Sequence, residues 1–221
     1  MFSKYISAVL ALSTIVASAP VCSTISFIEA ARVKQAFSNA KITPDVVPFF
    51  EPRVKVSASY PTTSNVDLGN RIGTLETVPE PKFTFNAEVG RDPKTTKYLK
   101  LIIDPDAPGP DGTIQAPLQG VLSEFLHLAI EDAQPDCVTE NPRTVRMYLN
   151  PTPLSVASHR YIFLVYRQPK DYESPLSLAL TIPGLRLQQF VDKYKLELVG
   201  GNFYLQGAGT NLGGIGEGGP I

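Results

Sequence analysis

Two carboxylates held between prolines form the most chemically suggestive segment of this sequence. The apolar residues 101–103 lead directly into Asp-Pro-Asp-Ala-Pro at 104–108. Proline fixes its own φ angle and restricts the residue before it, so the chain cannot continue here as a regular strand or helix. The pattern predicts a buried strand that brings Asp104 and Asp106 to a rigid corner, where a carboxylate can orient a ligand or a neighbouring imidazole.

The two histidines of the chain occupy similar positions on predicted strands. His127 lies in the apolar run 125–130, and His159 precedes the run 160–167. If these strands neighbour the strand that ends at Asp104, two imidazoles and a carboxylate meet at one edge of a sheet. Imidazole N–H groups donate to phosphate oxygens, and partial protonation at about pH 6–7 strengthens that bond. We therefore expect both histidines to bind a small anion, with Asp104 orienting an imidazole or accepting a bond from an amine.

Each of these residues also has a purely structural interpretation. A single histidine in an apolar strand is more often a hydrogen-bonded core residue than a ligand-binding group. Asp104 and Asp106 could both accept bonds from local backbone amides, and Asp106 is the better candidate for that role. Arg160 should point opposite to its strand neighbours and pair with a carboxylate or a carbonyl. The joint pattern, rather than any one residue, favours a site.

Metal, cofactor and hydrolase chemistry have weaker support. Asp104, His127 and His159 match the residue types of a facial triad, but no metal-ligand spacing accompanies them. An EF-hand beginning at Asp104 fails because Gln115 stands where glutamate is needed. The sequence has no Gly-x-Ser-x-Gly elbow, P-loop or dinucleotide-binding glycine pattern. We expect no metal, no cofactor and no enzymatic activity.

The segment 104–108, His-Arg-Tyr at 159–161 and Gln-Pro at 168–169 together resemble the phosphatidylethanolamine-binding protein family, over about residues 42–207. Ser-Glu-Phe-Leu-His at 123–127 is most similar to the fungal branch, which includes inhibitors of serine carboxypeptidases. The resemblance implies a mainly β fold, a β-sandwich with a large central sheet and a few peripheral α-helices. It also implies that the ligand is a phospholipid head group or another small phosphorylated anion.

The resemblance assigns roles to individual residues. In that family the matching aspartate and two histidines line an anion pocket, and Tyr161 stands where the family has a tyrosine after His-Arg. We expect Tyr161 and Pro153 to form walls of the pocket. The bond between Ala107 and the following proline is a candidate cis peptide bond. The structural motif around the pocket consists of Pro105, Asp106, Pro108 and Arg160.

The sequence departs from the family pattern beside the expected pocket. Residues 109–120 form an insertion, and Leu122 stands where a tyrosine is common. The segment 148–154 replaces a loop whose backbone amide helps to hold the anion. If Pro151 occupies the donating position, that hydrogen bond is lost because proline has no N–H.

A second function is inhibition of a serine carboxypeptidase through a protein–protein surface. In the resembled fungal branch, this role depends partly on the N-terminal segment. Residues 24–52 form such an extension, in which the capping-box residues 26–29 precede a good helix-forming stretch up to Asn39. A scaffold helix that packs on the sandwich is the favoured interpretation of this extension.

Composition indicates one domain built mainly from strands. The chain has 221 residues, a net charge of −1, 20 prolines and 16 glycines. The sequence has no cluster of Lys and Arg residues, so nothing in it suggests a nucleic-acid partner. Strands are expected at 54–58, 82–85, 98–103, 125–130 and 160–167, and a helix at 187–194, where the apolar spacing is helical. A single domain should span 24–207, followed by a flexible glycine-rich tail at 208–221.

The first 23 residues read as a secretory signal peptide. Lys4 precedes a short apolar core, and Ala-Ser-Ala at 17–19 is a cleavage signal. Cleavage is expected after residue 19 or 23, which predicts a secreted protein, either extracellular or within the secretory pathway or vacuole, without a membrane span. Cys22 and Cys137 can pair only if cleavage leaves Cys22 on the mature chain.

Overall fold

The structure is a computed structural model that describes residues 22–62, 65–108, 124–139, 141–153, 157–180 and 183–208. Three of the regions discussed above therefore lie wholly or almost wholly outside the described residues. These regions are the signal peptide (1–23), the insertion (109–120) together with Leu122, and the tail (208–221).

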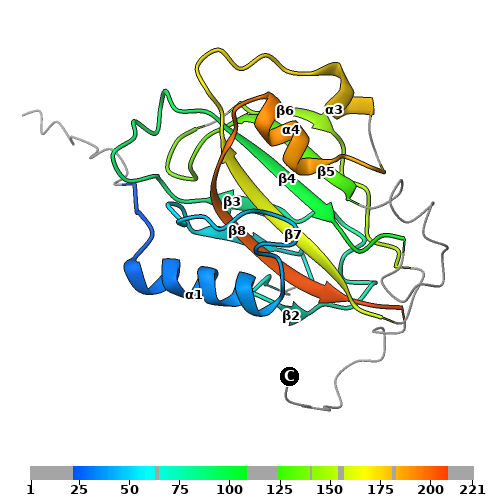
Figure 1. Ribbon diagram of the computed structural model, residues 1–221. Helices are drawn as coiled ribbons and strands as arrows, with labels where there is room; N and C mark the ends of the chain where they lie inside the picture. The colour runs from blue at the N-terminus through cyan, green and yellow to red at the C-terminus, as the bar shows by residue number, and fades with distance from the viewer. Residues whose placement is uncertain are drawn as a thin grey trace, which may run out of the picture.

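A large mixed sheet of six strands forms the centre of the molecule (Figure 1). Its strands follow the order β2-β8-β7-β4-β5-β6, and all neighbours are antiparallel except β2 and β8. The strands are β2 (Asn70–Arg71), β8 (Glu197–Gln206), β7 (His159–Arg167), β4 (Tyr98–Asp104), β5 (Phe125–Ala133) and β6 (Arg143–Arg146). A second sheet pairs β1 (Val56–Ser59) with β3 (Lys82–Phe85), and the helices are α1 (Phe27–Asn39), α3 (Leu176–Leu180) and α4 (Leu187–Lys193). The mainly β fold with a large central sheet and peripheral helices is confirmed.

The central strands are apolar on both faces because both faces are covered. All seven residues of β4 are buried. Ile102 and Phe163 point into a core shared with Phe83 of the small sheet. Since side chains alternate along a strand, Leu99, Leu101 and Ile103 face the other way, into a core shared with Phe37 of α1. The two-sided apolar pattern therefore marks the strands in the middle of the sheet.

Helix α1 begins where its capping box predicts. The Ser26 side chain accepts a bond from the backbone of Glu29, and the Glu29 side chain accepts one from the Ser26 backbone. Val33 and Phe37 are buried against the sheet, so α1 acts as a scaffold helix. Its first turn nevertheless leaves Phe27 exposed.

The sequence patterns do not predict strand β8, which has two glycines in its middle. A Cβ atom on Gly200 would lie 2.5 Å from Cγ2 of Val54, and one on Gly201 would lie 2.5 Å from Cζ of Phe37. Any larger residue would therefore collide with neighbouring elements. A glycine pair usually signals a turn, whereas here it permits close packing on both sides of the strand.

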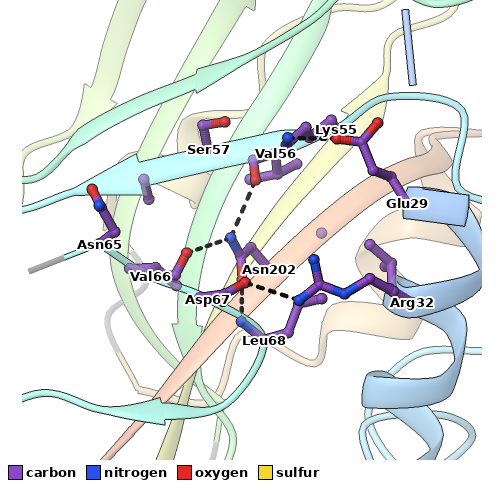
Figure 2. A pocket seen from close by; sticks show the side chains of 13 residues that line it. Glu29, Arg32, Lys55, Val56, Ser57, Asn65, Val66, Asp67, Leu68 and Asn202 are labelled. Carbon is purple, nitrogen blue, oxygen red and sulfur yellow. Dashed lines mark hydrogen bonds and ion pairs between the residues drawn. The ribbon is translucent and has the colours of Figure 1, made fainter. Parts of the chain in front are cut away.

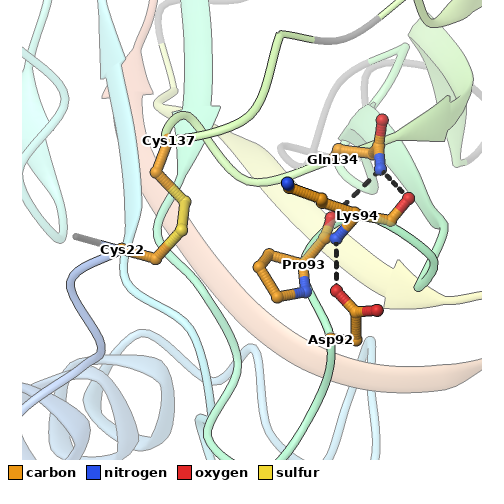
Figure 3. The surroundings of a disulfide bond; sticks show 6 residues. All are labelled: Cys22, Asp92, Pro93, Lys94, Gln134 and Cys137. Carbon is orange, nitrogen blue, oxygen red and sulfur yellow. Dashed lines mark hydrogen bonds between the residues drawn. A yellow bond between two sulfur atoms is a disulfide. The ribbon is translucent and has the colours of Figure 1, made fainter. Parts of the chain in front are cut away.

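A disulfide bond joins Cys22, just before α1, to Cys137, in the turn after β5 (Figure 3). The two residues are 115 positions apart in the sequence. Nearby, the side-chain amide of Gln134 donates to the carbonyls of Pro93 and Lys94, at 3.0 and 2.6 Å.

We expect Cys137→Ser to lower the free energy of unfolding by about 2–4 kcal/mol, because the cross-link restricts a long loop of the unfolded chain. Thermal and urea unfolding of the purified protein measure the change. The double variant Cys22→Ser/Cys137→Ser is the control for effects of a free thiol and should match the single variant. Unchanged stability in both variants would mean that the cross-link contributes nothing.

Candidate anion-binding site

The predicted site residues meet at one end of the central sheet, where β4 ends and β5 and β7 begin. Asp104, the last residue of β4, pairs with Phe125, the first residue of β5. On the other side, Ile103 pairs with Ile162 of β7, which places the start of β7 beside the same corner. Antiparallel neighbours thus bring three distant segments of the chain together.

A cavity of about 440 Å³ lies at this corner. All five residues predicted to contact a ligand contribute to its lining. The lining residues are Asp104, Ala107, Pro108, Phe125, His127, Leu149, Asn150, Thr152, Pro153, His159, Tyr161 and Pro183.

Asp104 is almost completely buried and holds two groups at once. Its Oδ1 accepts from the backbone N–H of Asp106 at 2.8 Å, and its Oδ2 lies 2.7 Å from Nδ1 of His159. Since an ionised carboxylate can only accept, the His159 ring donates through Nδ1–H. This geometry matches the orienting role expected for Asp104.

The expectation that Asp106 is the carboxylate bonded to a local amide is wrong. Asp104 accepts from the local amide, whereas Asp106 binds Arg160 through both of its oxygens, at 2.8 Å from Nε and 2.6 Å from Nη2. Arg160 Nη1 also donates to the carbonyls of Ala40 and Lys41, just after α1, at 3.1 and 2.9 Å. Arg160 is therefore the structural partner that its sequence position suggested.

The corner itself has the expected backbone. The peptide bond between Ala107 and Pro108 is cis. Pro105 separates the two carboxylates, which lets Asp104 face the cavity while Asp106 faces Arg160.

His127 lies at an irregularity of β5 that turns its ring toward the cavity. Ile102 pairs with Leu128 and Ile103 with Leu126, so His127 is the extra residue of a β-bulge. Its Nδ1 lies 2.6 Å from the carbonyl oxygen of Leu149, which can only accept. The neutral ring therefore carries its proton on Nδ1 and presents a lone pair on Nε2.

Burial lowers the pKa of His127, and its hydrogen bond to Leu149 and the nearby Asp104 carboxylate only partly oppose this effect. The neutral ring therefore predominates near pH 7. An anion at Nε2 would favour the protonated ring, since only that form can donate from both nitrogens.

Tyr161 forms an aromatic wall between the two histidines. Its ring stacks on that of His159 with the centroids 6.2 Å apart, and His127 meets it edge-on at 5.3 Å. On the interior side Tyr161 stacks on Tyr204 at 5.0 Å. Burial, followed by the charge of Asp104, raises the pKa of Tyr161 far above its ordinary value, so the phenol stays neutral.

The segment 148–153 closes another side of the cavity. The Tyr148 hydroxyl donates to the carbonyl of Thr77 at 2.7 Å, and the N–H of Leu149 donates to the carbonyl of His127 at 2.9 Å. Pro151 is outside the described lining, whereas its neighbours Asn150 and Thr152 belong to it. Both neighbours retain a backbone N–H, which proline lacks.

The lining includes three apolar residues that the sequence does not predict to contact a ligand: Phe125, Leu149 and Pro183. The first could have been found, because it stands two residues before His127 on the same strand and the two rings lie 4.8 Å apart. Leu149 and Pro183 come from irregular segments, for which no periodic signal exists.

Another cavity, of about 370 Å³, lies between α1, β1 and β8 (Figure 2). Its charged residues are already paired with each other, Glu29 with Lys55 and Arg32 with Asp67. The side-chain amide of Asn202 is also satisfied by surrounding backbone groups. The first cavity is therefore the stronger candidate for ligand binding.

The described ranges contain no group of three or more His, Cys, Asp or Glu side chains that could hold a metal ion. None of the helices in the same ranges is long and apolar enough to cross a membrane.

Comparison with known proteins places the chain in a family. A family model described as phosphatidylethanolamine-binding protein matches residues 62–204. The carboxypeptidase Y inhibitor of Saccharomyces cerevisiae is 25% identical over 192 residues, covering 70% of this chain and 84% of that protein. CEN-like protein 1 of Nicotiana tabacum is 27% identical over 139 residues, covering 63% of this chain and 73% of that protein.

Solved structures agree with this fold. A crystal structure of carboxypeptidase Y inhibitor complexed with its cognate proteinase superposes with a TM-score of 0.65 at 24% identity, covering 82% of this chain and 98% of that chain. A phosphatidylethanolamine-binding protein from Plasmodium vivax gives a TM-score of 0.58 at 18% identity, covering 78% and 96% of the two chains. With the family model matching well over half of its residues, the chain belongs to the phosphatidylethanolamine-binding protein family.

Proposed function

We propose that this protein binds small anionic ligands, with a phospholipid head group such as that of phosphatidylethanolamine as the favoured occupant. The observation that supports this proposal is the convergence of Asp104, His127 and His159 on one cavity at the end of the central sheet. A carboxylate that fixes an imidazole, beside a second imidazole and an aromatic wall, suits a phosphate group. The protein acts as a binder rather than an enzyme, since the sequence offers no recognised nucleophile motif.

The hydrogen bonds of the cavity favour one division of roles. Both oxygens of Asp104 already accept bonds from the protein, so Asp104 orients His159 and has little capacity left for an amine of the ligand. His127 supplies Nε2 to the phosphate and becomes protonated as the anion binds. Tyr161 and Pro153 form the walls.

We further propose that the protein is secreted. The signal peptide read from the first 23 residues supports this, and so does the disulfide between Cys22 and Cys137, because disulfides persist in oxidising compartments. Intact-mass analysis of the secreted protein locates the N-terminus directly.

Native mass spectrometry followed by lipid extraction tests the ligand. We expect a species bearing a phosphorylated head group in the wild-type protein and its loss in His159→Ala. Because His159 is buried, His159→Asn serves as a second variant that keeps more of the volume, and thermal unfolding checks that each variant is folded. Arg32→Ala, in the other cavity, is the matched control and should retain the species. Identical spectra for all four proteins would count against the pocket.

Affinity for phosphorylethanolamine should rise as pH falls from about 8 to about 6. The lowered pKa of His127 leaves the free ring neutral, so binding takes up a proton, which costs less in more acidic solution. If binding takes up one proton, the affinity for phosphorylethanolamine rises by at most about tenfold for each pH unit. Calorimetric titration of wild type and His127→Gln measures it.

The variant His127→Gln separates protonation of the protein from protonation of the ligand. Glutamine keeps an amide that can donate toward Leu149 but cannot become cationic. Phosphate groups also titrate at about pH 6. We expect the affinity of the variant to retain only the pH dependence that comes from protonation of the ligand. An identical pH profile in both proteins would exclude His127 as the proton acceptor.

Inhibition of a serine carboxypeptidase is a second candidate, supported by similarity to a carboxypeptidase Y inhibitor in sequence and in fold. The extension 24–52 could provide the contact through the first turn of α1, where Phe27 and Ile28 are 88% and 73% exposed. Deleting this helix would remove the buried Val33 and Phe37 and would damage the core. Substitutions in the exposed turn are therefore the sharper test.

We expect micromolar protein to inhibit carboxypeptidase Y and Phe27→Ser/Ile28→Ser to weaken inhibition at least tenfold, about 1.4 kcal/mol or more of binding free energy. A peptidase assay with a chromogenic substrate measures this. His159→Ala, which alters the anion cavity instead, is the comparison variant. Full peptidase activity in the presence of micromolar wild-type protein would remove this candidate.

A further inference from the structure

A cavity of about 670 Å³ lies at the other end of the central sheet from the cavity that holds the two histidines. Its lining carries four cationic side chains, those of Arg91, Lys97, Arg167 and Lys170, and one carboxylate, that of Asp132. The whole chain has a net charge of −1, so this excess of positive charge is local. We call this space the basic cavity, and the space beside the histidines the anion cavity.

Strand pairing places the basic cavity far from the anion cavity. The first residue of β4 pairs with the last residues of β5 and β7. Lys97 directly precedes β4, and Asp132 is the last but one residue of β5. Arg167 ends β7, eight residues after His159 of the anion cavity. About 26 Å of extended strand therefore separates the two ends.

Three of the four cations in the lining have no partner. Arg167 forms ion pairs with two glutamates. Within the described ranges, in contrast, the side chains of Arg91, Lys97 and Lys170 form no ion pair and no hydrogen bond. Uncompensated cations that line one cavity raise the local potential and attract an anion.

The buried side-chain amide of Gln168, in the same lining, is only half satisfied. Gln168 is 8% exposed, and its Oε1 accepts from the backbone N–H of Asp132 at 3.2 Å. This bond fixes the orientation of the amide, because the opposite orientation would bring two donors together. Its Nε2 has no acceptor among the described residues. Since buried donors are nearly always paired, this one marks a place that an acceptor from outside the chain can fill.

Backbone hydrogen bonds hold the walls of the basic cavity. The N–H of Gln168 donates to the carbonyl of Lys97 at 2.9 Å, which ties the segment after β7 to the start of β4. The N–H groups of Thr95 and Thr96 donate to the carbonyl of Asp92 at 3.3 and 3.0 Å, which shapes the loop before β4. A site whose walls are already ordered loses less conformational entropy when its ligand binds.

The carboxylate of Asp132 argues against a bare anion as the occupant. An ionised carboxylate only accepts hydrogen bonds, so it repels a phosphate or sulfate group but accepts from a hydroxyl group. The hydroxyls of Thr95 and Thr96, which also line the cavity, can both donate and accept. The combination fits a small ligand that carries an oxyanion and several hydroxyl groups.

We propose that the basic cavity binds a sugar that carries a phosphate or sulfate group. Arg91, Lys97 and Lys170 bind the oxyanion, Nε2 of Gln168 donates to the ligand, and Asp132 accepts from sugar hydroxyls. The proposal is independent of head-group binding, because no residue lines both cavities.

Calorimetric titration with glucose 6-phosphate and with glucose 6-sulfate tests the oxyanion. We expect Lys97→Gln/Lys170→Gln to lower the affinity at least tenfold, because two unpaired cations are removed. Lys82→Gln/Lys195→Gln removes two exposed lysines outside the cavity and is the matched control, which should bind like wild type. His127→Gln, in the anion cavity, should also bind like wild type. Thermal unfolding without ligand checks that each variant is folded.

These titrations have clear outcomes. Binding of either ester by wild type, with loss only in Lys97→Gln/Lys170→Gln, supports the proposal and names the anion. Failure of wild type to bind both esters overturns it. Loss of binding in His127→Gln, with full binding by Lys97→Gln/Lys170→Gln, would assign the ligand to the anion cavity and overturns it as well.

Glucose and the matching inorganic anion test the sugar. We expect wild type to bind the sugar ester at least tenfold more tightly than inorganic phosphate or sulfate, and not to bind glucose. Asp132 has a φ of 57°, which glycine adopts freely, so Asp132→Gly removes the carboxylate without straining the backbone. This variant should bind the inorganic anion at least as tightly as wild type and lose the preference for the ester. Equal affinity of wild type for the ester and the inorganic anion would overturn the assignment of a sugar.

Discussion

The buried carboxylate of Asp104 is the constraint on which the rest of the site depends. It ends a strand that is buried along its whole length, and its two oxygens accept from the backbone of Asp106 and from the ring of His159. A buried charge is tolerated only when its hydrogen-bonding capacity is used. Asp104 therefore ties the proline corner to the start of β7 and fixes which nitrogen of His159 carries the proton.

A second carboxylate joins the corner to the helical layer. Asp106 holds Arg160 through two charge-assisted hydrogen bonds, and the same guanidinium reaches the carbonyls that follow α1. The fold thus places one carboxylate on each side of the same turn, one facing the cavity and one facing the scaffold. Such support keeps a binding site in one geometry before its ligand arrives, which lowers the cost of binding.

Local signals predicted the elements that depend on neighbouring residues. The capping box placed the start of α1, the two-sided apolar runs marked β4 and β7 as interior, and helical spacing identified α4. The signals failed for β8. Its glycines at 200 and 201 are required by close contact with Val54 and Phe37, which lie far away in the sequence. They also assigned the bond from a local amide to Asp106, whereas Asp104 accepts it, because the partner of Asp106 is Arg160, more than fifty residues away in the sequence.

The sequence by itself determined which chemical groups are available: two histidines, a rigid acidic corner and an apolar strand before it. Only the tertiary structure decided that His127 lies on a bulge facing the cavity and that the carbonyl of Leu149 holds the proton of that ring on Nδ1. The reason is physical. Propensity and periodicity act over a few residues, whereas hydrogen-bond partners and neighbouring surfaces are set by strand pairing between distant segments.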